Sequence, residues 1–101
     1  MYDHNQTLVP DSFLALYVRH GQPLLARKEM EARYEGAELL AEQVAAVVAS
    51  VPADDAASQG EALGAVKASL LADLLREREP EAAWVVTRAA EICGWAPIDD
   101  L

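Results

Sequence analysis

Four glutamates recur at helical spacing near the middle of the chain, and carboxylates are side chains that bind cations. They are Glu31, Glu35, Glu38 and Glu42. Steps of three and four residues place them in one narrow stripe on a helix surface. Such a stripe could be a solvated face, meet a basic groove on a partner, or share a divalent cation. A di-iron bundle needs Glu-x-x-His pairs facing inward from its helices, and both histidines, His4 and His20, lie outside the three long predicted helices. We therefore assign no metal site.

A second candidate group lies near the end of the chain, where Trp84 precedes Arg88 by one helical turn and Trp95 follows shortly after. If the apolar residues of this segment face the core, Trp84 is left partly exposed, with Arg88 in cation–π reach. An exposed tryptophan beside an arginine is typical of an interface hot spot. The alternative is that Trp84 plugs the end of the bundle beneath the N-terminal segment. If it is an interface, a two-fold homodimer is its simplest form.

Nucleophilic catalysis has little support. The single cysteine, Cys93, falls on an apolar face at a predicted helix C-terminus, where the helix dipole disfavours a thiolate. His20 precedes Gly21 in a predicted turn, and no serine occupies a strand–turn–helix elbow that would pair with it. Tyr17 and Tyr34 are predicted to be core residues with a hydroxyl at the surface. We assign no catalytic residue and no cofactor.

The elements that must position these side chains are predicted to be helices. A short helix is expected over residues 10–21, with a buried strand as the alternative, since a short apolar run is ambiguous. Asp11 and Ser12 are candidate caps for it. A long helix follows over about residues 25–50 and ends before Pro52.

Two further helices complete the predicted fold. Residues 58–61, with the sequence SQGE, fit a capping box that opens a helix to about residue 77. Pro80 begins the last helix, which runs to about residue 93 and ends at Gly94. The chain should therefore be a compact all-α bundle of about four helices. We divide it into a flexible leader (1–9), one domain (10–97) and an acidic tail (98–101).

Helical spacing also predicts the core, with the 25–50 helix as the centre of packing. The core residues expected there are Met30, Tyr34, Ala37, Leu40, Ala41, Val44, Val47, Val48 and Val51. Those of the third helix are Leu63, Val66, Leu70, Leu71 and Leu74. Those of the last helix are Val85, Ala89, Ile92 and Cys93. Gly36 lies off this arc, and a glycine inside a helix costs about 1 kcal/mol relative to alanine.

Charge restricts the partners. The chain carries 17 acidic and 8 basic residues, a net charge of −9, so it should repel nucleic acids and anionic membranes. The N-terminus has no signal-peptide pattern, and no apolar run approaches the roughly 20 residues that span a bilayer. A lone cysteine requires no oxidising compartment. We expect a cytoplasmic protein.

Three segments, VPDSFLALYV, ARYEGAELLAEQ and EAAWVVTRAAEICGW, resemble in order a group of small proteobacterial helical proteins. Some members of that group are labelled "ATPase with chaperone activity". The resemblance implies a bacterial protein and allows a role as an accessory subunit or adaptor of a chaperone ATPase. The chain itself has no GxxxxGK[ST] loop, and Lys67 lies in mid-helix without the glycines that such a loop needs.

The interpretation that these patterns favour is a non-enzymatic interaction or regulatory module. It would bind a protein partner or form a homodimer through Trp84, Arg88, Trp95 and the glutamate stripe. The adaptor role is the alternative, and a small enzyme with an unrecognised site between helices is a third.

Overall fold

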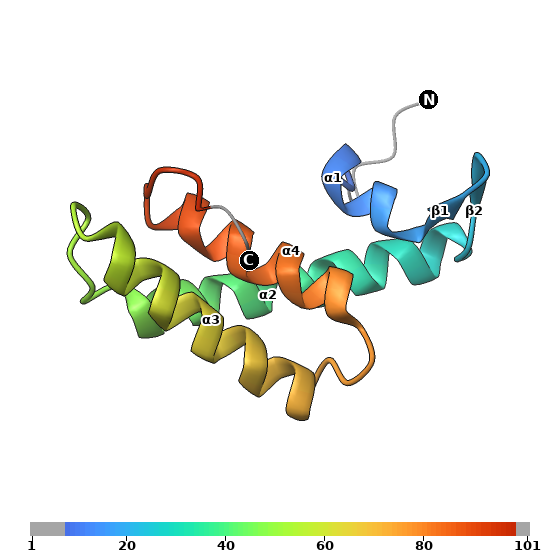
Figure 1. The fold of residues 1–101 in the computed structure, drawn as a ribbon. Coiled ribbons are helices and arrows are strands. Elements are labelled where there is room, and N and C mark those ends of the chain that lie inside the picture. Colours follow the sequence, from blue (N-terminus) through green and yellow to red (C-terminus); the bar gives the residue numbers. More distant parts are fainter. Residues whose placement is uncertain (1–7, 99–101) are drawn as a thin grey trace.

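Three long helices build the core of the chain. The computed structural model describes residues 8–98, in which α2 spans Arg27–Val48, α3 spans Ala56–Ala72 and α4 spans Glu79–Ile92. Before them come α1 (Asp11–Leu14), a 3-10 turn η1 (Ala15–Tyr17) and a hairpin of β1 (Val18–Arg19) and β2 (Gln22–Pro23). Figure 1 shows α1 and the hairpin at the end of the molecule where α2 begins. The predicted compact all-α bundle is confirmed. Most of the predicted leader and tail lie outside the described residues.

The N-terminal segment forms the predicted short helix, but over fewer residues, Asp11–Leu14. The alternative of a buried strand is wrong, because the strands that follow, β1 and β2, are exposed. Pro10, rather than Asp11 or Ser12, is the N-cap of α1, and no side chain caps this helix, so the predicted capping role of Asp11 and Ser12 is wrong. The chain then reverses at His20 and Gly21, whose φ angles are 54° and 77°. Positive φ at both central residues is what a type I′ hairpin turn requires.

The α2 helix forms close to its predicted range. Its fully buried side chains are Met30, Ala37, Ala41, Val44, Ala45 and Val48. Tyr34, Leu40 and Val51 are half-buried against this core. Val47, in contrast, is 74% exposed, so its predicted place in the core is wrong. It is 100° around the helix from Val48, on a side that neither α3 nor α4 covers.

The α3 helix begins and ends earlier than predicted. Asp55 is its N-cap, and the Asp55 carboxylate accepts hydrogen bonds from the Ser58 amide at 3.0 Å and the Ser58 hydroxyl at 2.8 Å. These bonds lower the pKa of Asp55 and occupy the hydroxyl that the predicted capping box required, so that prediction is wrong. The helix ends at Ala72, five residues early. As a result Leu75 is buried, and the predicted core residue Leu74 is 67% exposed.

The α4 helix, not α2, is the centre of packing, because α4 lies against α2 and α3 lies against α4 more extensively than against α2. Its buried residues are Glu81, Ala82, Val85, Val86, Ala89 and Ala90. Leu63 and Leu70 of α3 are buried in the same core. Ile92 was predicted to face the core but is 40% exposed. It lies on the same side of the helix as Val85, seven residues earlier, but it is the last residue of α4 and so lies at the end of the packed interface. Pro80 lies in the first turn, as predicted.

The end of α4 is a Schellman motif. Gly94 has a φ of 75°, the left-handed conformation predicted for it. The Gly94 amide donates to the Glu91 carbonyl at 2.9 Å, and the Trp95 amide donates to the Ala90 carbonyl at 3.0 Å. This reversal folds Trp95 back onto the helix, where it is only 8% exposed. None of the helices in residues 8–98 has the length and apolar character needed to cross a membrane.

Candidate functional site: the Trp84–Arg88 hollow

A cluster of four aromatic rings joins the N-terminal segment to α2 and α4. Phe13 is its centre and is fully buried. The Phe13 ring lies 5.6 Å from Tyr17, 5.6 Å from Tyr34 and 5.1 Å from Trp84, measured between centroids. Tyr34 and Trp84 also meet edge to face at 5.9 Å. Tilted and edge-to-face contacts in this distance range are the favoured geometries of aromatic pairs.

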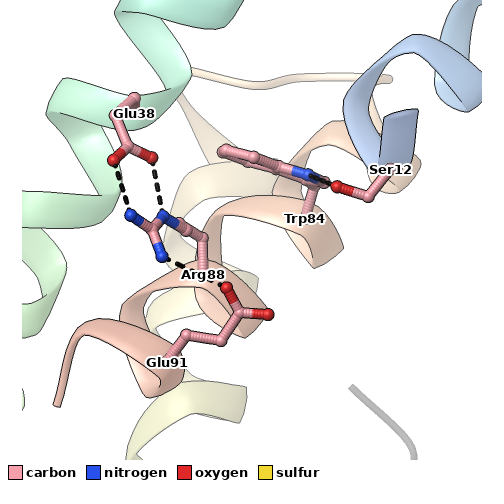
Figure 2. Close-up of polar contacts among 5 residues, drawn as sticks. All are labelled: Ser12, Glu38, Trp84, Arg88 and Glu91. Atoms are coloured by element: carbon pink, nitrogen blue, oxygen red, sulfur yellow. Dashed lines mark hydrogen bonds and ion pairs between the residues drawn. The ribbon is translucent and has the colours of Figure 1, made fainter. Parts of the chain in front are cut away.

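Trp84 plugs the end of the bundle, as one of the two alternatives predicted, and part of its ring stays at the surface. Its ring is half-buried and packs on Phe13 and Tyr34 beneath the N-terminal segment. The indole Nε1 donates a hydrogen bond to the Ser12 hydroxyl at 3.0 Å, so Ser12 contacts Trp84 and not the end of its own helix (Figure 2). The remaining part of Trp84 lines a hollow in the surface.

Arg88 is held in place by two carboxylates. Its Nε and Nη2 atoms donate to the two carboxylate oxygens of Glu38 at 2.9 and 3.0 Å, and its Nη1 donates to Glu91 at 3.2 Å. Figure 2 shows this fork between α2 and α4. The bond to Glu38 is the main reason that the pKa of Arg88 is raised. Among the described residues, the arginine found over an aromatic ring is Arg33, over Tyr17. Arg88 therefore forms a bidentate ion pair with Glu38 instead of the predicted cation–π contact with Trp84.

The hollow beside these residues has a volume of about 250 Å³. Pro10, Tyr34 and Trp84 form its apolar wall, and Thr87, Arg88 and Glu91 form its polar side. Burial raises the pKa of the Tyr34 hydroxyl, and the charge of Glu38 acts in the same direction. A neutral phenol, an exposed threonine and a well-packed indole thus face the same space.

The glutamate stripe runs along α2 beside this hollow, but its members differ. Glu38 is the partner of Arg88, and Glu31 forms a surface ion pair with Arg27 at 3.6 Å. Glu35 and Glu42 are exposed. Within residues 8–98, no three His, Cys, Asp or Glu side chains gather closely enough to hold a metal ion. The ion pair between Glu38 and Arg88, which are 50 positions apart in the sequence, thus connects the stripe to the hollow.

Trp95 does not belong to this surface. It was predicted as part of an exposed partner-binding group, but the turn at Gly94 buries it against the last turns of α4 and Ile98. The correction has a local physical cause, because the left-handed glycine directs the next side chain back to the helix. Cys93 is half-buried, and its thiol lies 3.6 Å from the Ala45 carbonyl. His20 is exposed in the hairpin turn.

A buried carboxylate that the sequence analysis missed lies at the N-terminal end of α4, two turns before Arg88. Glu81 is 5% exposed and accepts a hydrogen bond from the Tyr17 hydroxyl. Arg33 of α2 reaches the same carboxylate at 3.8 Å and lies over the Tyr17 ring at 5.6 Å. The Tyr17 hydroxyl was predicted to be at the surface, so that expectation is wrong. One signal was present: Glu81 stands in the first turn of a helix, where an acidic side chain is favoured.

The Tyr17–Glu81 contact predicts a pH effect. Burial, and then the Glu81 carboxylate, raise the pKa of Tyr17 above its ordinary value of 10.0. The folded state therefore favours the neutral phenol, and its contribution to stability is complete below pH 10 and lost as the pH rises through the raised pKa. The measurement is the phenolate absorbance at 295 nm of the unmodified chain and of Tyr17→Phe, each titrated with base. We expect the two titration curves to differ only above pH 10, where the Tyr17 hydroxyl ionises. A difference between the two curves that is already present at or below pH 10 would contradict this assignment.

No family model, curated protein or solved structure matches the chain.

Proposed function

We propose that the chain is a protein–protein interaction module that binds a basic segment of another protein across the Trp84–Arg88 hollow. The observation that carries this proposal is the combination of a rigid aromatic wall with the exposed Glu91 carboxylate and the neighbouring glutamate stripe. Trp, Tyr and Arg are the residues most often found at interface hot spots, and all three line this hollow.

The wall is preorganised for binding. Trp84 is held by Phe13, Tyr34 and the Ser12 hydroxyl, so little side-chain freedom remains to be lost when a partner docks. Ordering a mobile side chain at an interface costs about 0.5–1.5 kcal/mol. A partner's apolar side chain placed against Trp84 and Pro10 would therefore retain most of the free energy gained by its burial.

The charges around the hollow favour a basic partner. Glu38 already neutralises Arg88, whereas the Glu91 side chain is 63% exposed. Glu42 is exposed on the neighbouring stripe, and the whole chain carries a net charge of −9. Complementary charge steers association and selects partners more than it adds affinity. A second copy would bring the same acidic rim to a two-fold interface, so we favour a different protein over a homodimer.

The proposal is tested with a synthetic amphipathic peptide of leucines at helical spacing and lysines elsewhere, titrated by calorimetry at low and high salt. We expect saturable binding of this peptide, weaker at high salt, and none of a counterpart with glutamate in place of lysine. Thr87→Arg should weaken binding at least about tenfold, or about 1.4 kcal/mol, because it adds bulk and positive charge at the rim. Ser69→Arg is the control, since it makes the same charge change at an exposed position of α3.

Two outcomes would overturn this function. One is equal binding of the lysine and glutamate peptides, which would remove charge as the basis of recognition. The other is an equal effect of Thr87→Arg and Ser69→Arg, which would move binding away from the hollow. Light scattering on the free chain gives the oligomeric state in the same samples, and a dimer dissociated by Thr87→Arg would replace the foreign partner with a second copy.

A further inference from the structure

A second hollow lies between α2 and the corner where α3 leads into α4, away from the Trp84–Arg88 hollow. Its volume is about 370 Å³. Ala32, Ala37, Leu40 and Leu75 supply apolar side chains, and Arg33, Arg78 and Glu81 supply charged ones. Of the four hollows described, this is the one in which arginines outnumber carboxylates. A mostly apolar space with a few convergent polar groups is the usual form of a small-molecule site.

The two arginines retain hydrogen-bonding capacity. Arg33 reaches Glu81 at 3.8 Å, which is longer than a hydrogen bond, and its side chain also hydrogen-bonds the Tyr17 hydroxyl. A guanidinium group has five N–H donors, so these two contacts leave several of them available. The Arg78 side chain is exposed and forms no ion pair or hydrogen bond with another side chain of residues 8–98, whereas the neighbouring Glu79 is paired with Lys67 at 2.8 Å. Two guanidinium groups therefore border the same space with donors available to an acceptor from outside the chain.

Glu81 does not cancel this positive character. Its carboxylate is buried, accepts a hydrogen bond from Tyr17 and has Arg33 as its ion-pair partner. Arg78 then contributes an excess positive charge at the mouth of the hollow, on a chain that is otherwise strongly acidic. An arginine fork and a planar carboxylate match each other in geometry as well as in charge.

Gly36 adds an independent observation. It lies within α2 and lines this hollow, although glycine is a poor residue inside a helix. A Cβ atom at this position would meet nothing within 4 Å, so packing within the chain does not require glycine here. What the missing side chain does provide is room along the wall of the hollow, beside Arg33 and Leu40.

We infer that this hollow binds a small organic carboxylate with an aliphatic tail. The carboxylate lies between Arg33 and Arg78, and the tail lies along Leu40, Leu75 and the open surface at Gly36. This site is separate from the proposed function, because the two hollows share no lining residue and this one selects an anion where the Trp84–Arg88 hollow selects a cation.

The test uses octanoate as the probe, followed by amide chemical shifts of the ¹⁵N-labelled chain. We expect saturable shifts centred on Gly36, Leu75 and Arg78, with a dissociation constant of about 1 mM or tighter, in the range of weak small-ligand binding. Octanol, which lacks the charge, and acetate, which lacks the tail, should each bind at least about tenfold more weakly. Gly36→Leu should abolish binding by filling the hollow, and Arg78→Gln should weaken it about tenfold.

A matched control separates blocking from a change in the fold. Gly64 is also a helical glycine whose added Cβ would meet nothing within 4 Å, but it lies on α3 outside this hollow, so Gly64→Leu should bind octanoate like the unmodified chain. Absence of saturable shifts, shifts centred instead on the apolar hollow at Leu14 and Met30, equal binding of octanol, or full binding by Gly36→Leu would each overturn the inference.

Discussion

Replacing Val44 with aspartate is expected to leave the chain unfolded at room temperature. Val44 is 6% exposed near the C-terminal end of α2, in the core shared with α3 and α4. A carboxylate there would be buried without a partner, a change that belongs to the few mechanisms that cost about 4 kcal/mol or more. A domain of this size is stabilised by only about 5–15 kcal/mol in total. Leu70→Asp, at an equally buried position of α3, should have the same result.

Val47→Asp is the matched control on the same helix. Val47 is 74% exposed, so the new charge stays in water and the free energy of unfolding should change by no more than about 0.5 kcal/mol. Far-UV circular dichroism with urea titration measures both variants. A cooperative transition for Val44→Asp at the urea concentration of the unmodified chain would contradict the assignment of the core. So would equal damage from the two substitutions.

The contrast between Val44 and Val47 also shows what a helical pattern can predict. Spacing identifies the apolar side of a helix. The helix-breaking or helix-starting residues predict the ends: Pro52 the end of α2, Pro80 the start of α4 and Gly94 the end of α4. Spacing does not say how wide an arc the neighbouring helices cover. Nor does it say where a helix stops: Val47 falls at the edge of the arc of α2, Leu74 follows the end of α3, and Ile92 is the last residue of α4, so all three are exposed.

The candidate site could be predicted in part for the same reason. Trp84, Arg88 and the glutamate stripe were identified from residue type and spacing, which are local properties. The pairing of Arg88 with Glu38 and of Tyr17 with Glu81 joins residues 50 and 64 positions apart, and only the packing of helices brings them together. Trp95 was misplaced although the decisive signal, Gly94, was recognised, because the direction of the chain after the turn depends on the Schellman hydrogen bonds.

Phe13→Ala is the second substitution for which we expect a large effect. Phe13 is fully buried, and its ring contacts Tyr17, Tyr34 and Trp84. Removing a buried phenylalanine costs about 3–5 kcal/mol, which lowers the melting temperature of a domain this small by at least about 12 °C. Leu24→Ala in the same N-terminal segment is the control, because Leu24 is 52% exposed and its loss should cost no more than about 0.5 kcal/mol.

The same substitution tests whether the Trp84–Arg88 hollow depends on the N-terminal segment. The Trp84 indole donates to Ser12, next to Phe13 in the sequence, so a cavity at Phe13 should release this contact and shift the fluorescence of Trp84 to longer wavelength. Trp95 packs at the other end of α4 and should not respond, which Trp84→Phe and Trp95→Phe backgrounds can verify. If Phe13→Ala melted early but kept the fluorescence of Trp84 and bound the lysine peptide as before, Phe13 would stabilise the bundle without shaping the hollow. If all three properties changed together, the aromatic cluster would be the structure that makes a short N-terminal segment part of the binding surface.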